Sequence, residues 1–431
     1  MSSPRASRFT KRSRLGVALT QRGRLFVALT VVLFVGAYAA GNREFLYVGG
    51  LLLALLVFAI VLVRGKRLRL AAVRTFSPPV VAVGTTTTVT ITVANESSTR
   101  STEAEWQDTL PFWPWFSEIG TLPPLSPTGR FAKHNSVTTL RYVLRPTQRG
   151  VVSVGPMDVT HNDPFGLVRG ESALAGVQSL VVTPAVVDLP DAGLAFAVGD
   201  GSARLVQRSA SGNDDDLMTR EYRRGDALRR VHWRASARHG ELMVRQEEQR
   251  SRPEARIVVD TRRSGYDDVT LKPVRGQTAT LESETFEWVV RMTASIGVHL
   301  HRSGFVVSVV ESGPAQIAPF GEANQWAAQD ESFLASLATV AVLDEKSPLL
   351  AAQADNGAGP VFAIVGDPDA ETLEWLLRQR RPQQNAIAFV PRWAKHAAEA
   401  LANAGWTCIV TRTTDDPAAA WAAVAADGGR S

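Results

Sequence analysis

Two long apolar runs near the N-terminus limit this chain more than any other feature of its sequence. Leu25–Ala40 gives sixteen apolar or small residues, and Phe45–Val63 gives nineteen more after the short connector Gly41–Glu44. An α-helix rises about 1.5 Å per residue and the hydrocarbon core of a bilayer is about 30 Å thick, so both runs are of a length to cross it. The sequence therefore predicts a two-helix transmembrane hairpin over residues 25–63.

Two other interpretations compete with the hairpin. A cleaved signal peptide would need a small-residue cleavage site, and none separates the two runs. Two buried helices of a soluble core are the second alternative. Charged residues flank both runs and are nearly absent within them, which favours membrane spans over either alternative.

The basic residues predict the side of the membrane on which the rest of the chain lies. Seven precede the first run and four follow the second: Arg5, Arg8, Lys11, Arg12, Arg14, Arg22 and Arg24, then Arg64, Lys66, Arg67 and Arg69. Cytoplasmic flanks of membrane helices are enriched in Lys and Arg. We therefore expect a two-pass protein of the cell membrane, with a basic tail over residues 1–24 and the bulk of the chain on the cytoplasmic side. The single cysteine agrees with a reducing compartment.

The net charge of +5 does not indicate a nucleic-acid-binding protein. Residues 1–74 carry a net charge of +12, which leaves −7 for the remainder of the chain. A nucleic-acid binder carries its positive field on its folded domains. We therefore expect the lipid bilayer, and no nucleic acid, among the partners.

The pattern of hydrophobic residues divides the rest of the chain into two regions. Residues 70–190 are predicted to form an antiparallel β-sandwich, because short alternating strands are separated by Pro and Gly. Those strands are expected at Thr88–Val93, Thr138–Leu144, Gly150–Val154 and Gln178–Val182. Residues 256–431 are predicted to form a doubly wound α/β domain, because strands alternate with helices.

The strands of this α/β domain are expected at Ile257–Asp260, Phe305–Val310, Val361–Val365, Ala386–Val390 and Thr407–Thr411. Its helices are expected at Leu281–His301, Gln325–Ala338, Ala370–Arg378, Arg392–Ala404 and Pro417–Ala425. Within this domain Cys408 falls in an apolar strand, which predicts a buried, inert thiol. No P-loop, nucleophile elbow or His-Glu-x-x-His motif occurs in the sequence.

Residues 199–255 form a linking segment that matches neither pattern. The stretch Arg220–Arg256 contains eleven arginines and no lysine. Asp226 is a good N-cap for a short helix through His239, and Gly240 is a good C-terminal stop. Within this helix Trp233 is expected to be buried and to anchor the segment, with several arginines facing outward.

The string REYRRGDALRRVHWRASARHGELMVRQEE in this segment resembles the signature of the domain of unknown function 58 family. The matching residues are Arg220, Tyr222, Gly225, Asp226, Arg229, Trp233, Ser236, Ala237 and Arg238. The stretch Asp163–Leu167 (DPFGL) and the paired N-terminal spans are also similar to that family. The resemblance implies a sandwich-like segment followed by a von Willebrand A-like α/β domain. It implies a MoxR-type AAA+ ATPase and a transglutaminase-like membrane protein as partners, and it implies no reaction.

The arginine-rich segment has three interpretations. It could bind nucleic acid, but acidic residues are interspersed and few aromatic residues could stack on bases. Its arginine side chains could pair with acids between the two regions and lock them together, or they could bind carboxylates on a partner protein. The last two interpretations remain open for Arg220, Tyr222, Arg223, Gly225, Asp226, Arg229, Arg230, Trp233, Arg234, Ser236 and Arg238.

A von Willebrand A-like domain would bind a divalent cation through an Asp-x-Ser-x-Ser loop after its first strand. Asp260 and Ser264 match that loop, but Arg262 stands where the first serine should be. A guanidinium cannot ligate a cation, so we expect no metal and no cofactor, with Asp260 either pairing with Arg262 or ending its strand. The alternative is a divalent-metal-dependent hydrolase that uses Asp260, Ser264 and Asp367. The stretch Asp367–Asp369 is more typical of a turn and a helix cap.

The apolar loop Pro111–Phe116 lies either on the nearby bilayer or against one end of the sandwich. Taken together, these features predict a non-enzymatic, membrane-tethered cytosolic adaptor that binds proteins. Its expected partner is a MoxR-type AAA+ ATPase in the assembly of envelope or secreted proteins.

Overall fold

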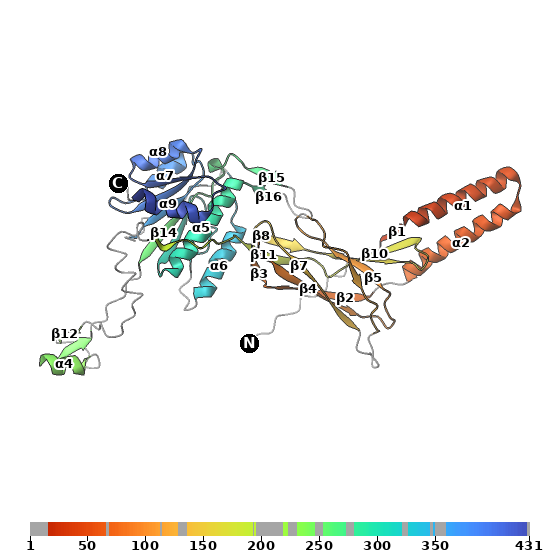
Figure 1. Ribbon diagram of the computed structural model, residues 1–431, viewed down its shortest axis with the longest axis horizontal. Helices are drawn as coiled ribbons and strands as arrows, with labels where there is room; N and C mark the ends of the chain where they lie inside the picture. Colours follow the sequence, from red (N-terminus) through yellow and green to blue (C-terminus); the bar gives the residue numbers. More distant parts are fainter. Residues whose placement is uncertain are drawn as a thin grey trace. The chain divides into compact units, whose positions relative to one another are not determined.

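The computed structural model describes residues 16–65, 69–112, 114–127, 136–192, 194, 219–222, 231–245, 253–272, 280–320, 326–344, 348–349 and 359–428. The chain forms two compact units (Figure 1). The first contains Met1–Thr183 with Pro273–Thr278, and the second contains Pro184–Lys272 with Ala279–Ser431.

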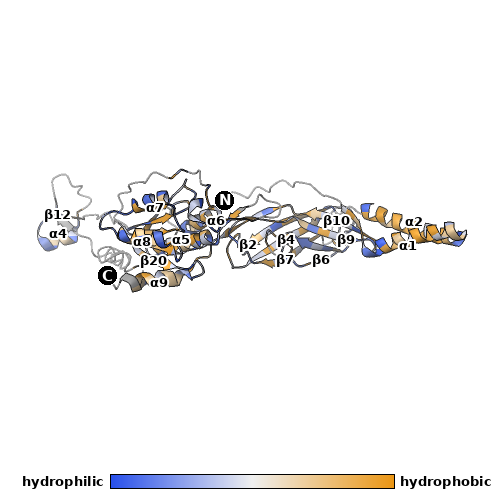
Figure 2. Cartoon of the chain, turned by 90° about the horizontal axis from the view of Figure 1, so that it is seen from above, coloured by the Kyte–Doolittle hydropathy of each residue, from blue (hydrophilic) through white to orange (hydrophobic). Residues whose placement is uncertain are grey.

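Two apolar helices begin the first unit, as the sequence predicts. They are α1 (Gln21–Ala40) and α2 (Arg43–Gly65), which pack together as a hairpin whose surface is mostly hydrophobic (Figure 2). Gly41 ends α1 with a φ of 63°, a left-handed conformation that glycine adopts without strain. Both helices are long and apolar enough to cross a membrane.

In the part of the first unit that the structure describes, the strands form three sheets. Their strands are β1 (Gly16–Leu19), β2 (Leu70–Ser77), β3 (Val80–Ala82), β4 (Thr87–Asn95), β5 (Ala104–Asp108), β6 (Gly120–Leu122), β7 (Val137–Leu144), β8 (Gly150–Val154), β9 (Met157–Asn162), β10 (Val168–Leu174) and β11 (Gln178–Thr183). The sheet orders are β1-β10-β9-β5-β6, β2-β4-β7 and β3-β11-β8. All pairs are antiparallel except β3 with β11, which is parallel.

The strands surround one hydrophobic core. In β4, residues 87, 89, 91, 93 and 95 are buried and their neighbours are more exposed, which is the period-two pattern seen in the sequence. Val89 and Ile91 meet Trp106 of β5 and Leu180 of β11 in the same cluster. This arrangement is consistent with the predicted sandwich.

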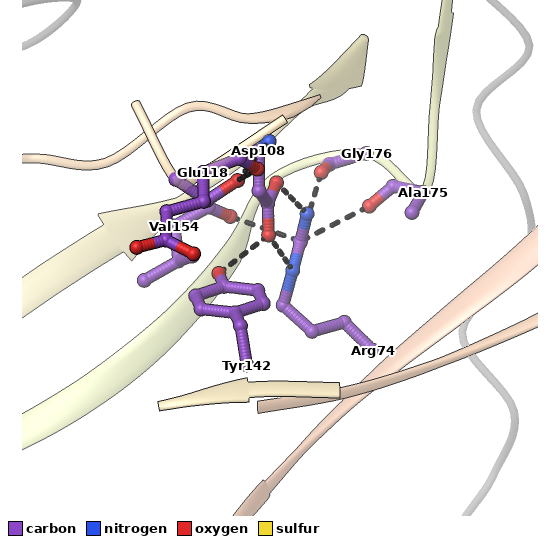
Figure 3. A network of polar contacts seen from close by, with 8 residues as sticks. Arg74, Asp108, Glu118, Tyr142, Val154, Ala175 and Gly176 are labelled. Atoms are coloured by element: carbon purple, nitrogen blue, oxygen red, sulfur yellow. Dashed lines mark hydrogen bonds and ion pairs between the residues drawn. The ribbon is translucent and has the colours of Figure 1, made fainter. Parts of the chain in front are cut away.

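A buried ion pair crosses this core (Figure 3). The side chains of Arg74 and Asp108 have no exposed surface, and their closest atoms are 2.5 Å apart. Tyr142 donates its hydroxyl to the same carboxylate at 2.6 Å, and Arg74 also donates to the carbonyl of Val154 at 3.0 Å. Burial and the adjacent Asp108 raise the pKa of Tyr142, so it remains a donor. Each buried charge is therefore paired, as burial requires.

The second unit contains an all-parallel sheet with the order β17-β14-β18-β19-β20. Its elements in chain order are β14 (Glu254–Val259), α5 (Glu284–Arg302), β17 (Val306–Glu311), α6 (Trp326–Thr339), β18 (Val361–Ile364), α7 (Ala370–Leu377), β19 (Ala386–Pro391), α8 (Lys395–Asn403), β20 (Thr407–Thr411) and α9 (Pro417–Gly428). A small hairpin, β15 (Thr270–Lys272) with β16 (Thr280–Glu282), precedes α5.

Helices cover both faces of this sheet. Ile257 of β14 packs with Trp288 of α5 and Trp421 of α9, whereas Val258 packs with Leu376 of α7 and Leu401 of α8. Because successive side chains of a strand point to opposite faces, these two clusters are the two sides of a doubly wound sheet. The predicted alternation of strands and helices is confirmed.

Several boundaries differ from the sequence prediction, and the start of the long helix α5 shows why. The long helix was expected from Leu281, but Thr280–Glu282 forms β16 and the helix begins at Glu284. Ser283 is its N-cap and accepts the backbone N–H of Phe286 at 3.0 Å. A serine hydroxyl that satisfies a free helix donor fixes the start of a helix, and this start overrides the apolar stripe that continues upstream.

Candidate functional site

The strand order of the sheet brings two loops together at the carboxyl ends of its strands, which we call the carboxyl edge. From β14 the chain passes to β17 on one side, and later to β18 on the other side. The carboxyl ends of β14 and β18 therefore form the point at which the strand order reverses. Open α/β sheets bind ligands at such a point. The loops that follow these two strands contain Asp260 and Asp367, respectively.

Asp260 is the most deeply buried acid of this edge, with 1% of its surface exposed. Its Oδ1 accepts the hydroxyl of Ser312 at 2.7 Å and the backbone N–H of Arg262 at 3.1 Å. Among the described residues no donor reaches its Oδ2. Burial raises the pKa of Asp260 to about 6, because the charged form loses its hydration.

The loop around Asp260 has no room for a larger residue at position 265. A Cβ on Gly265 would lie 2.3 Å from Oδ2 of Asp260. The Gly265 carbonyl accepts the backbone N–H of Asp367 at 2.9 Å, which ties the loop after β14 to the loop after β18. Burial raises the pKa of Asp367, and the nearby Asp267 raises it further.

Arg262 extends to the start of α7. Its Nη1 donates to Oε2 of Glu371 at 3.1 Å and to the hydroxyl of Thr372 at 3.1 Å, and it lies 3.9 Å from Oδ1 of Asp369. The side chain is only 8% exposed. Asp260 was expected either to pair with the Arg262 side chain or to end its strand. It ends the strand and accepts the backbone N–H of Arg262, whereas the guanidinium of Arg262 bonds α7. The Thr372 and Glu371 contacts could not be foreseen, because they lie more than one hundred residues away in the sequence.

Asp369 is the N-cap of α7, as the sequence predicts, and accepts the backbone N–H of Thr372 at 2.8 Å. Burial acts to raise the pKa of Asp369, but the hydrogen bonds from Thr372, with the nearby Ser264 and Arg262, outweigh it and lower the pKa. The structure thus gathers Asp260, Ser264 and Asp369 around the fixed cation of Arg262. Among the described residues, no group of three or more His, Cys, Asp or Glu side chains could hold a metal ion.

The described residues of the arginine-rich segment form a small module. Strands β12 (Thr219–Glu221) and β13 (Met243–Arg245) pair antiparallel, and helix α4 (Trp233–His239) lies between them in the chain. Arg220 and Tyr222 lie at β12, whereas Arg223, Gly225, Asp226, Arg229 and Arg230 lie outside the described residues.

The N-terminal boundary of α4 corrects the sequence prediction. A helix beginning at Asp226 is wrong, because Val231 forms a β-bridge with Val244. His232 is the N-cap instead, and its Nδ1 accepts the backbone N–H of Ala235 at 3.1 Å. Gly240 ends the helix with a φ of 77°, as predicted. A histidine cap has no signal in the sequence comparable to that of aspartate, which explains the error.

Ser236 joins α4 to strand β13. Its hydroxyl accepts the backbone N–H of Met243 at 2.8 Å and donates to the carbonyl of His232 at 3.1 Å. Met243 is buried together with Val231 and Val244. Ser236 therefore stabilises the module, and it is not a free group for a partner.

Trp233 is exposed, which overturns the expectation that it is a buried anchor. Its exposed fraction is 71%, and α4 has no buried residue. Arg234 and Arg238 are exposed too, and they are neighbours because residues four apart share a helix face. The buried hydrophobic residues described in this module, Val231, Met243 and Val244, all lie outside α4.

Two other candidates are resolved by burial. Cys408 is half-buried rather than fully buried, and its burial raises the pKa to about 11, which favours an inert thiol. In the loop Pro111–Phe116, Phe112 is buried in the core of the first unit and Trp115 is 38% exposed. The burial of Phe112 favours the interpretation that this loop packs against the sheets; Trp113 lies outside the described residues.

Solved structures offer only weak likenesses. One is the CARDB domain of a Pyrococcus furiosus protein in complex with di-metal ions, 15% identical over 24% of this chain and 86% of that chain, with a TM-score of 0.17. Another is an alkylpurine DNA glycosylase of Pseudomonas fluorescens, 9% identical over 28% of this chain and 33% of that chain, with a TM-score of 0.18. A third, a sporulation control protein of Bacillus subtilis, is 9% identical over 32% of this chain and 55% of that chain, with a TM-score of 0.14. These TM-scores are too low to indicate a shared fold.

No curated protein matches the chain. A family model does match, over residues 218–325, and its description is protein of unknown function DUF58. The matched range contains the module of β12, α4 and β13, together with β14, α5, β17 and the loop of Asp260. The string at residues 220–248, which carried the sequence resemblance, lies within this range, and over this range the chain belongs to the domain of unknown function 58 family.

Proposed function

We propose that this protein is a membrane-tethered adaptor that binds a partner protein in the cytoplasm. The apolar hairpin of α1 and α2 would hold it in the membrane with two passes. The second unit, with a von Willebrand A-like architecture by resemblance, would carry the docking module into the cytoplasm. The positively charged flanks of the hairpin support this orientation.

The exposed Trp233 is the observation that carries the proposal. The Trp233 side chain has 71% of its surface exposed and is therefore available to pack into a pocket on a partner. Arg234 lies next to it, and Arg238 follows one helical turn later. Tryptophan and arginine dominate the energetics of protein interfaces, and arginine reads carboxylates through paired hydrogen bonds. The docking surface is therefore the exposed side of α4, defined by Trp233, Arg234 and Arg238, and its partner should present an acidic surface with an apolar pocket.

The family resemblance suggests which partner to test first. A MoxR-type AAA+ ATPase fits the expectation, and a transglutaminase-like membrane protein is the second candidate. Docking such an ATPase at the membrane would place its activity near envelope or secreted-protein assembly. The adaptor itself needs no reaction for this role.

The experiment measures the affinity of the full-length protein in detergent for a purified MoxR-type AAA+ ATPase of the same organism. Trp233→Ala should weaken binding at least about tenfold, which corresponds to about 1.4 kcal/mol. Arg234→Glu should weaken it further, because reversal of an interfacial charge is repulsive.

The second unit offers a matched control. Arg392 and Trp393 form another exposed arginine–tryptophan pair, with Trp393 53% exposed, outside the docking surface. Trp393→Ala and Arg392→Glu should leave the affinity unchanged. Equal losses at both pairs, or no loss at Trp233, would contradict the docking surface on α4.

The hydrolase alternative has less support. Its residues Asp260, Ser264 and Asp367 do lie at the carboxyl edge of the sheet, where ligands bind. However, Arg262 already supplies the positive charge among these acids, and a divalent cation placed there would be repelled by it.

A further inference from the structure

In the first unit, the sheet that contains β1 and β10 continues directly into the apolar hairpin of α1 and α2. Strand β1 pairs antiparallel with β10, with Leu19 opposite Val168, and α1 begins two residues after Leu19. Thr20 makes the connection. Its hydroxyl donates to the carbonyl of Gly166 at 2.6 Å and accepts the backbone N–H of Gly23, the third residue of α1, at 3.1 Å. One side chain thus caps the helix and holds the turn between β9 and β10.

That turn is the DPFGL stretch, and its own hydrogen bonds fix its shape. The buried Asp163 accepts the backbone N–H of Phe165 at 2.8 Å and that of Val168 at 2.6 Å. Gly166 has a φ of 67°, which permits the reversal. Phe165 is left at the tip of the turn with 44% of its surface exposed.

Close packing fixes this turn at the base of the hairpin. Leu167 and Val168 are buried against Ala59 and Val63 of α2. A Cβ on Gly23 would lie 2.1 Å from the carbonyl oxygen of Leu167, so the backbones of α1 and the turn are in direct contact and no side chain fits between them. The exposed Phe165 is therefore held beside the ends of two helices that are apolar enough to cross a membrane.

Basic side chains surround the same base. Arg22 and Arg24 lie in the first turn of α1 and Arg64 in the last turn of α2, and all three are exposed. The Nη1 of Arg22 would be 3.7 Å from a Cβ on Gly166, which places this guanidinium at the turn. We call Phe165, Arg22, Arg24 and Arg64 the basal surface.

We propose that the basal surface binds the anionic phospholipid headgroups of the leaflet from which the hairpin enters the bilayer. Exposed phenylalanine side chains at a membrane surface insert at the boundary between headgroups and acyl chains, so Phe165 would lie there, beside the headgroups that the arginines bind. Arginine forms paired hydrogen bonds with phosphate, and basic residues next to a membrane helix attract anionic lipids. The surface is continuous with the hairpin, and its charge is opposite to that of these lipids.

This inference rests on the membrane attachment in the proposed function, but not on the docking surface of α4. Flotation of the full-length protein with liposomes, after a carbonate wash, tests the attachment alone. A protein that does not float overturns both the attachment and the basal surface. A protein that floats leaves the basal surface to be decided by the two measurements below.

The first measurement is the membrane depth of position 165. Because Cys408 is the sole cysteine, a Cys408→Ser background allows a single spin label at Phe165→Cys. Ile119→Cys is the control, since Ile119 is 67% exposed in the same unit. The strand register places Ile119 away from the hairpin. Ala104 of β5 pairs with Leu122 nearer the hairpin, whereas Trp106 pairs with Gly120 farther from it, and Ile119 lies beyond Gly120.

The labelled proteins are reconstituted in nanodiscs of phosphatidylcholine and phosphatidylglycerol. The label at 165 should collide more often with oxygen and less often with a water-soluble nickel chelate than the label at 119. Equal accessibility of the two labels to the nickel chelate would overturn the proposal, because position 165 would then lie in water.

The second measurement is lipid selectivity. Full-length protein extracted from mixed nanodiscs should retain phosphatidylglycerol several-fold in excess over its share of the mixture, as counted by native mass spectrometry. The triple variant Arg22→Gln, Arg24→Gln, Arg64→Gln should lose this excess, and Arg141→Gln, an exposed arginine of β7, should keep it. A wild-type protein without any excess overturns the headgroup site, whatever the triple variant does.

Discussion

The guanidinium of Arg262 lies 3.1 Å from the carboxylate of Glu371, and this pair joins the loop after β14 to the first turn of α7. The side chain of Arg262 is almost completely buried, whereas that of Glu371 is 67% exposed. The positive charge is therefore held inside the edge of the sheet, next to the buried Asp260. A fixed cation at this position has a direct consequence for metal binding.

We expect millimolar Mg²⁺ or Mn²⁺ to leave the melting temperature of the wild-type protein unchanged, because Arg262 repels a cation from the loop. Arg262→Ser removes that charge and supplies a hard oxygen, so the same ions should now stabilise the second unit. At one hundred times its Kd a ligand stabilises by about 2.7 kcal/mol, a shift that calorimetry detects. Adding Asp260→Asn to Arg262→Ser should abolish the gain. A metal-dependent shift in the wild type that Asp260→Ala removes would instead support the hydrolase.

Asp260 should make the second unit less stable as the pH rises. Its pKa is about 6 in the folded chain and 3.8 in the reference state, so the folded state binds the proton more tightly. The benefit of protonation is present below pH 4 and is lost as the pH rises to about 6, with a difference of about 3 kcal/mol.

The measurement is hydrogen exchange in β14 and β18 between pH 4 and pH 7, compared with Asp260→Asn. The amide keeps an oxygen for Ser312 and cannot titrate, so the gap between the two proteins should change over this range. Parallel pH profiles would show that Asp260 does not titrate with a raised pKa.

Trp233 is exposed and Trp421 is buried, so their replacement by alanine should change the stability by very different amounts. Trp233→Ala should change the free energy of unfolding by no more than about 0.5 kcal/mol, since the side chain is exposed. Trp421→Ala should cost about 3–5 kcal/mol, because Trp421 is fully buried, and it also loses the hydrogen bond from its Nε1 to the carbonyl of Pro190. Thermal unfolding of the full-length protein compares the two. A large loss for Trp233→Ala would mean that α4 is packed against the chain.

Removing one member of the buried ion pair should destabilise the first unit severely. Arg74→Met leaves Asp108 buried without its partner, at a cost of about 3–5 kcal/mol. Adding Asp108→Leu and Tyr142→Phe removes the unpaired groups and should recover part of that loss. Recovery stays incomplete because the carbonyls of Val154 and Gly176 lose their donor. Urea unfolding followed by hydrogen exchange in β4 tests this order, and a triple variant less stable than Arg74→Met would contradict it.

The orientation of the hairpin is testable in cells. Protease added to intact spheroplasts should leave the chain after Gly65 uncut, because the basic flanks hold it inside. Permeabilised spheroplasts are the control in which cleavage should occur. Cleavage from outside in intact cells would reverse the orientation and remove the cytoplasmic adaptor from consideration.

Local chemistry explains what the sequence by itself determined. The two apolar helices, the alternating strand of β4 and the succession of strands and helices from β14 onward follow from hydrophobic periodicity, which acts over a few residues. The caps at Asp369 and Gly240 follow from side-chain and backbone chemistry within one turn. The family signature, the string at residues 220–248, is equally local.

Only the tertiary structure decided the features that depend on distant residues. Arg262 meets Glu371, and Thr20 meets Gly166, across more than one hundred residues, and no periodicity encodes such contacts. The burial of a side chain also depends on what other segments cover it. Trp233 was expected to be buried as the anchor of its helix with the arginines facing outward, but α4 is short and has no buried residue. Packing between distant segments, which sequence patterns do not contain, therefore determined where the basal surface and the docking surface lie.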